Sequence, residues 1–190
     1  MPALLNGSPT HPLIVHAVAV LLPLAVLGAL ALVFVPATRR AYGALTLLVG
    51  FVACLAVPLA FASGGGLEDR VPPSPLIARH VHLAHQLLPV AAVFGVLLAL
   101  FVFLDIARRE GRGELNRVEA AVMARVAGGA HSRRRPSDRT RTGRLQQGAA
   151  TLLVLASLAT AVAVVRTGDS GSKAAWHGRL APAGQSLRRP

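Results

Sequence analysis

Histidines are the residues of this chain whose type and spacing suggest chemistry. Five of the seven fall in two short stretches, His11 and His16 in the first and His80, His82 and His85 in the second. A long apolar run follows each stretch. Haem iron takes one axial nitrogen from each side of the ring, so a bis-histidine haem in a membrane needs one imidazole from each of two helices. His16 and His85 lie about 5 to 6 Å inside their apolar runs, so we predict them as ligands of a haem b.

Other ligand sets use the same histidines. His82 and His85 share a helix face because they are three residues apart, and the pair could hold a metal ion together with His11. His11, His80 and His82 are therefore alternative ligands, or neighbours of the ligands. A proton relay is disfavoured because the apolar runs contain no Asp or Glu.

A structural interpretation competes with the cofactor interpretation. Polar side chains inside membrane helices often hydrogen-bond to neighbouring helices. The two hypotheses are thus a haem or metal protein that passes electrons to a redox or membrane-protein partner, and a non-catalytic accessory or structural subunit. No catalytic residues are predicted for either.

An internal repeat relates the two histidine stretches. A shift of 69 residues superimposes His11 on His80 and His16 on His85, and each copy reads as His, four residues, His, then an apolar run. This pattern predicts two helical hairpins that pack as a pair.

Four charge-free windows determine the fold class: 13–35, 43–62, 81–104 and 148–165. Only 15% of residues are charged and the mean hydropathy is +0.55, which excludes an ordinary soluble domain. Each window is long enough to cross a hydrocarbon core of about 30 Å as a helix. We predict an all-α, integral membrane four-helix bundle in contact with the lipid bilayer.

Basic residues predict the orientation. Arg39 and Arg40 lie between the first two windows, and eleven arginines lie in segment 105–147, so thirteen of the twenty basic residues share one side. By the positive-inside rule that side is the cytoplasm. The chain is then N-out and C-out in a bacterial cytoplasmic membrane, with the remaining segments outside: 1–12, 63–80 and 166–190.

The basic segment has two predicted parts. Residues 113–127 show apolar residues at steps of three and four, which favours an amphipathic helix. Residues 128–144 are rich in Gly, Ser, Pro and Arg, which predicts an unfolded stretch. Anionic lipid headgroups are its expected partner, at about 1 kcal/mol per basic residue, and nucleic acid is not.

The C-terminal segment contains the only tryptophan, Trp176, followed by His177. Trp prefers the headgroup region of a bilayer. We predict that residues 168–177 fold back over the outer end of the bundle, so that Trp176 and His177 form a lid over the histidines. The alternative is a solvated tail, which the flexible glycines Gly168 and Gly171 suggest.

Three stretches resemble a known family. These are His11-Pro12-Leu13-Ile14-Val15-His16, the outer-loop runs 63–68 and 74–80, and the ending Arg166 to Trp176. Together they resemble the uncharacterised bacterial membrane family called domain of unknown function 2231. The resemblance implies a four-helix membrane protein and no assigned activity.

Overall fold

The computed structural model describes residues 4–5, 8–68, 72–125 and 137–176. Within these ranges the chain forms four long helices, α1 (Thr10–Phe34), α2 (Thr38–Glu68), α3 (Pro75–Arg125) and α4 (Ser137–Trp176). Two antiparallel strands of two residues each, β1 (Leu4–Leu5) and β2 (Ser8–Pro9), precede α1. All four helices are long and apolar enough to cross a membrane, which confirms the predicted all-α four-helix membrane bundle.

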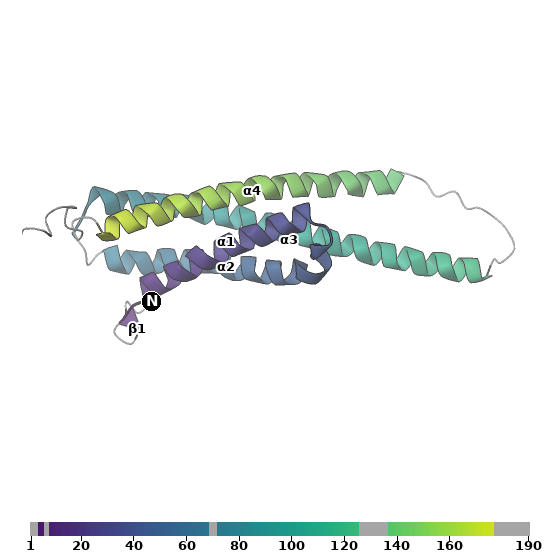
Figure 1. Cartoon of the computed structure of the whole chain (residues 1–190), viewed down its shortest axis with the longest axis horizontal. Helices are drawn as coiled ribbons and strands as arrows, with labels where there is room; N and C mark the ends of the chain where they lie inside the picture. Colours follow the sequence, from purple (N-terminus) through teal and green to yellow (C-terminus); the bar gives the residue numbers. More distant parts are fainter. Residues whose placement is uncertain (1–3, 6–7, 69–71, 126–136, 177–190) are drawn as a thin grey trace, which may run out of the picture.

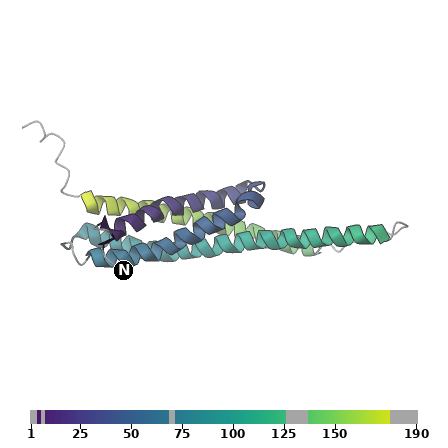
Figure 2. The same ribbon diagram turned by 90° about the horizontal axis from the view of Figure 1, so that it is seen from below.

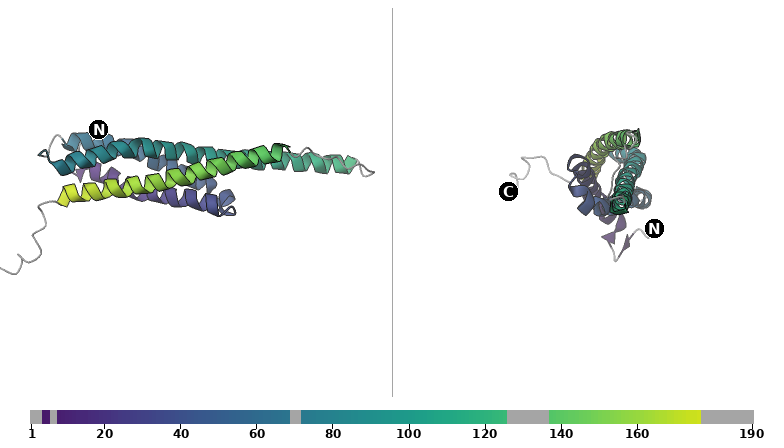
Figure 3. Two further views of the ribbon diagram at one scale, coloured as in Figure 1. Left: turned by 90° about the horizontal axis from the view of Figure 1, so that it is seen from above. Right: turned by 90° about the vertical axis from the view of Figure 1, so that its right-hand side faces the viewer.

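The helices form a bundle in which α1 and α3 are diagonal to each other. α1 packs against α2 and α4, and α3 packs against the same two helices. Figure 1 shows the four helices lying lengthwise, and Figure 3 gives the view along the bundle. The starts of α1 and α3 share one end with the finishes of α2 and α4, which we call the histidine end. The opposite end, at the turn between α1 and α2, is the arginine end.

Five buried positions on α1 and five on α3 follow one pattern. In each helix these five alternate steps of four and three residues, the spacing of a left-handed coiled-coil seam, while Val26 on α1 and Leu83 and Val102 on α3 are buried outside the alternation. A shift of 69 residues maps the first set onto the second, which confirms the predicted pair of related hairpins. The two sets are Val18, Leu22, Ala25, Ala29 and Leu32 on α1, and Leu87, Ala91, Phe94, Leu98 and Phe101 on α3.

Glycines allow the helices to approach closely inside the bundle. A Cβ added at Gly50 would lie 2.6 Å from the Leu98 side chain, and one at Gly28 would lie 2.8 Å from Thr46. Small residues at helix contacts are typical of membrane bundles, where close backbone approach increases dispersion contacts. Leu98 of α3 therefore fills the space beside Gly50 of α2, and Thr46 of α2 fills the space beside Gly28 of α1.

The outer surface of the bundle is apolar. Large hydrophobic side chains such as Val20, Leu27, Phe51, Val96 and Leu155 are each more than half exposed. An apolar surface of this extent is costly in water and favourable against lipid tails. The protein therefore contacts the lipid bilayer along its length.

The helices are longer than the charge-free windows predict. α2 continues to Glu68, α3 begins at Pro75 and α4 continues to Trp176, so much of the predicted outer loop and tail is helical. Ser74 marks the start of α3, since its Oγ accepts a hydrogen bond from the Ile77 amide at 3.2 Å and Pro75 is the first helical residue. A charge-free window ends at the first charged residue, whereas a helix continues for as long as its backbone hydrogen bonds do.

The basic segment 105–147 also differs from the prediction. The predicted helix over 113–127 is confirmed as far as Arg125, where it continues α3 without a break. α4 begins at Ser137, so the prediction of an unfolded stretch over 128–144 is wrong from Ser137 onward. Residues 126–136 lie outside the described residues. With 51 residues α3 is about 75 Å long, more than a bilayer requires. Figures 1 and 2 show it projecting beyond the turn between α1 and α2.

Candidate functional site

His11 connects the first two helices at the histidine end. It lies at the start of α1, and its Nδ1 is 3.0 Å from the backbone oxygen of Ala60 and 3.1 Å from Ser63 Oγ on α2. The Ser63 hydroxyl donates to the same Ala60 oxygen at 2.8 Å. Because the carbonyl can only accept, Nδ1 of His11 carries the proton and Nε2 of the neutral ring has a free lone pair.

His80 makes the same set of contacts in the second hairpin. Its Nδ1 is 3.2 Å from the Thr167 backbone oxygen and 3.1 Å from Ser170 Oγ on α4, and the Ser170 hydroxyl donates to the Thr167 oxygen at 2.8 Å. The carbonyl again assigns the proton to Nδ1. The internal repeat therefore extends to the partner helix: the His–Ser–carbonyl triad of the first hairpin occurs again in the second.

A glycine lies beside each of these imidazoles. A Cβ added at Gly64 would lie 3.1 Å from Cε1 of His11, and one added at Gly171 would lie 2.9 Å from Cε1 of His80. Both distances are below ordinary van der Waals contact. Each Ser-Gly pair, on α2 and on α4, thus supplies a hydrogen-bond partner and the space that the ring occupies.

Both imidazoles lie at the histidine end of the bundle, on diagonal helices. Both rings are half-buried, and neither Nε2 has a hydrogen-bond partner among the residues that the structure describes. No group of three or more His, Cys, Asp or Glu side chains able to hold a metal ion occurs in the part of the chain that the structure describes.

The histidines first predicted as haem ligands lie elsewhere. His16 and His85 are both exposed on diagonal helices. Nδ1 of His16 is 2.6 Å from the Pro12 oxygen of its own helix, and the His85 ring contacts Phe61 edge-on, with ring centroids 4.5 Å apart. His82 is also exposed and pairs with Gln86 at 3.0 Å.

The predicted lid is wrong for the residues that the structure describes. α4 runs without interruption to Trp176, so residues 168–176 continue the helix instead of folding back, and the Trp176 side chain is 58% exposed. His177 lies outside the described residues. Gly168 and Gly171 suggested a flexible tail, but backbone hydrogen bonds of the helix hold both.

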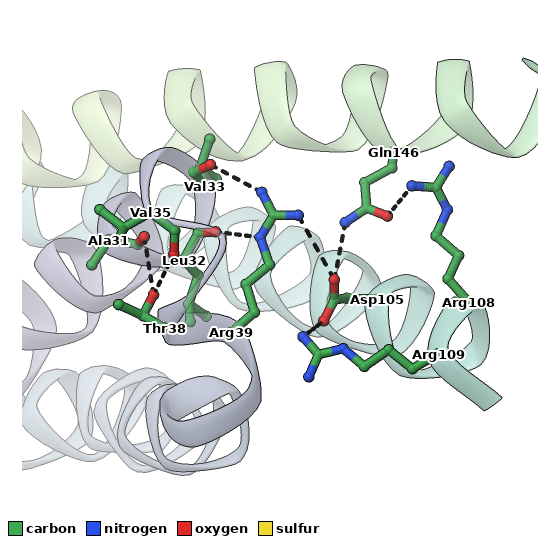
Figure 4. Close-up of polar contacts among 10 residues, drawn as sticks. All are labelled: Ala31, Leu32, Val33, Val35, Thr38, Arg39, Asp105, Arg108, Arg109 and Gln146. Atoms are coloured by element: carbon green, nitrogen blue, oxygen red, sulfur yellow. Dashed lines mark hydrogen bonds and ion pairs between the residues drawn. The ribbon is translucent and has the colours of Figure 1, made fainter. Parts of the chain in front are cut away.

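A polar network at the arginine end caps α1. Thr38 Oγ1 donates to the Val35 oxygen at 2.8 Å, and Arg39 donates to the oxygens of Leu32 and Val33 at 2.6 and 3.0 Å. Figure 4 shows both side chains of α2 turned back onto the last turn of α1. These bonds satisfy carbonyls that a helix end leaves without partners, which matters most near lipid.

Asp105 of α3 is the centre of the same network. Its carboxylate lies 3.8 Å from Arg39 and forms a close ion pair with Arg109, while Gln146 of α4 donates to it at 3.4 Å. Gln146 also accepts a bond from Arg108. The guanidinium of Arg39 lies 5.2 Å from the centre of the Phe101 ring. Asp105 thus joins three helices at one point (Figure 4).

A pocket of about 540 Å³ opens beside this network. Its polar lining is four arginines, one aspartate and one glutamine, so at neutral pH the formal charge of the lining is positive. The residues that line it are Pro36, Ala37, Arg39, Arg40, Asp105, Arg108, Arg109 and Gln146.

The fold and the two polar ends define a polytopic helical membrane protein made of two related hairpins. The chain belongs to the family described as a predicted membrane protein, domain of unknown function 2231, which matches residues 7–183. This confirms the family suggested by the sequence motifs. No curated protein and no solved structure shows a significant match to the chain.

Proposed function

We propose that the protein holds a bis-histidine haem in the membrane and serves in electron transfer, with His11 and His80 as the axial ligands. The observation that supports this most is the matched pair of Nδ1 hydrogen bonds to the oxygens of Ala60 and Thr167. Ligating histidines usually donate their other ring nitrogen to a carbonyl or carboxylate, which fixes the ring and makes the ligating nitrogen more basic. Both Nε2 atoms are thereby left as candidate donors to iron.

The number of ligands favours haem over a single metal ion. A structural zinc site needs four protein ligands and a catalytic one needs three, whereas haem iron already has four porphyrin nitrogens and needs only two. His11 and His80 supply two, and the described residues contain no group of three or more candidate ligands around them. Bound haem would supply one-electron chemistry, and the chain would supply two oriented imidazoles in a half-buried setting.

This assignment changes the ligands from His16 and His85 to His11 and His80, which the sequence suggested as alternates. His16 and His85 are exposed on the outer faces of two diagonal helices. We therefore do not expect both of them to bind one haem inside a single bundle. With the positive-inside orientation, the proposed site lies near the outer face of a bacterial cytoplasmic membrane.

A second candidate function is that of a structural or accessory subunit. The same hydrogen bonds join α1 to α2 and α3 to α4, which is what interhelical histidines do without any cofactor. In that case His11 and His80 contribute to stability alone.

A visible spectrum of the full chain distinguishes the two. The protein is expressed with a supply of haem precursor, purified in detergent and measured oxidised and after reduction with dithionite. We expect a Soret band and narrow reduced bands of a six-coordinate, low-spin haem, with about one haem per chain. Replacement of either ligand, His11→Ala or His80→Ala, should convert the spectrum to a five-coordinate form or remove it.

The matched controls are His16→Ala and His85→Ala, which remove a histidine from the same two helices. They should keep the wild-type spectrum. A colourless protein after expression with ample haem would support the structural role, as would His11→Ala and His80→Ala variants whose only change is a lower unfolding temperature. A Soret band lost only in the His16 and His85 variants would restore the first assignment.

A further inference from the structure

We infer that the pocket at the arginine end is a binding site for the phosphate of an anionic phospholipid headgroup. This site is separate from the histidine pair, because the two lie at opposite ends of the bundle. The inference therefore does not depend on haem binding.

The depth of the pocket in the membrane supports a lipid. Pro36 and Ala37 directly follow the first charge-free window, Asp105 directly follows the third, and Gln146 lies two residues before the fourth. Charge-free windows of these lengths span the hydrocarbon, so residues just beyond them lie at the level of the headgroups. A lipid phosphate is present at that level at high local concentration.

The charge of the lining supports an anion. Arg39, Arg40, Arg108 and Arg109 face one carboxylate, that of Asp105, which leaves a formal charge of +3. Guanidinium groups bind phosphate oxygens in a bidentate manner, and basic pockets between membrane helices on the cytoplasmic side bind anionic headgroups. A zwitterionic headgroup would bring its own cation into this field and gain much less.

The arginines divide into two roles. Arg39 and Arg109 pair with Asp105, and Arg39 also caps α1, so these two side chains are held in place. Arg40 is exposed and forms no hydrogen bond or ion pair with any side chain that the structure describes. Arg108 bonds to Gln146, a neutral partner that leaves its charge uncompensated. Arg40 and Arg108 are the groups that would bind the phosphate.

Exposed apolar residues that are near the lining residues along the chain could hold the acyl chains of a bound lipid. Phe34 and Tyr42, which flank the turn between α1 and α2, are 68% and 56% exposed, and Leu145, next to Gln146, is 58% exposed. Inorganic phosphate gains nothing from contact with this apolar surface, whereas a bound phospholipid would bury the surface under its acyl chains. The combination favours a phospholipid over a free anion.

The test is lipid binding to the detergent-purified full chain, measured by titration calorimetry. The probes are short-chain phosphatidylglycerol, short-chain phosphatidylcholine and inorganic phosphate. We expect saturable binding of phosphatidylglycerol, with phosphatidylcholine and inorganic phosphate each at least about tenfold weaker. Arg40→Gln and Arg108→Gln should each weaken phosphatidylglycerol binding roughly five- to tenfold, as expected for loss of one cationic contact.

The matched control is Arg166→Gln, which removes an exposed arginine near the opposite end of α4. It should leave the affinity unchanged, and circular dichroism should show that all three variants keep their helical content. Equal loss in the Arg166 variant would mean non-specific attraction and would overturn the site. Equal affinity for phosphatidylcholine would overturn the anion preference, and equal affinity for inorganic phosphate would overturn the lipid assignment.

Discussion

Replacement of Gly171 by alanine tests the contact between α4 and the His80 ring. The added Cβ would lie 2.9 Å from Cε1 and 3.2 Å from Nδ1 of His80, so the ring must move by several tenths of an ångström. The Nδ1 bond to the Thr167 oxygen is already 3.2 Å long and would be lost. The same movement would strain the contact of Nδ1 with Ser170 Oγ, which is 3.1 Å long. A buried donor that loses its partner costs about 1 to 3 kcal/mol.

Alanine also favours the helix, and this effect has the opposite sign. An alanine in place of a helical glycine stabilises by about 0.5 to 1 kcal/mol. The net expectation for Gly171→Ala is a loss of about 1 kcal/mol in the free energy of unfolding. Gly168 lies one helical turn earlier, and an added Cβ there meets nothing within 4 Å. Gly168→Ala should therefore stabilise by about 0.5 to 1 kcal/mol.

The assay is unfolding of the purified protein in mixed micelles with increasing SDS, followed by circular dichroism. The two variants should shift the midpoint in opposite directions, with a difference of about 2 kcal/mol between them. If Gly171→Ala were as stable as Gly168→Ala, the close approach of His80 to α4 would be refuted.

The first hairpin offers the same comparison. A Cβ at Gly64 would lie 3.1 Å from the His11 ring, whereas one at Gly65 meets nothing within 4 Å. Gly64→Ala should be destabilising relative to Gly65→Ala, by less than the difference in the second hairpin because the contact is looser. If the haem proposal holds, Gly64→Ala and Gly171→Ala should also change the visible spectrum.

Three further predictions concern single positions. Trp176 is exposed at the end of α4, about 16 Å beyond Val165, the last residue of the fourth charge-free window. It should emit like indole in water and be fully quenched by iodide; a blue-shifted, protected emission would restore the lid. Cys54, the only cysteine, donates to the Ala91 oxygen at 3.2 Å and should react with a membrane-permeant maleimide at least about tenfold more slowly than after unfolding in SDS; equal rates would contradict its packing. A reporter fused after Arg144 should be active only as a cytoplasmic reporter because most basic residues lie on that side, and activity only outside would reverse the orientation.

The sequence by itself determined the class of protein and much of its packing pattern. Four charge-free windows admit only spanning helices, because lipid leaves no alternative partner for the backbone. The shift of 69 residues, visible at His11 and His80, also predicts the buried seams of α1 and α3. A repeat in sequence keeps the same face of each helix inward, so this part of the tertiary structure was readable in advance.

Helix ends were not readable from the windows. The charge-free windows mark the segments that cross the hydrocarbon core of the bilayer. The helices α3 and α4 continue beyond these segments. A glycine in such a segment suggests a turn, yet Gly168 and Gly171 both lie within α4, which packs along α3.

The choice among the histidines was made by the tertiary structure. His11, His16, His80 and His85 are alike in the sequence, and depth along the helix favoured His16 and His85. Burial depends on rotation about the helix axis. His11 and His80 turn inward, to Ser63 and Ser170, whereas His16 and His85 are exposed. Their partners lie 52 and 90 residues away along the chain, so no local pattern could identify them.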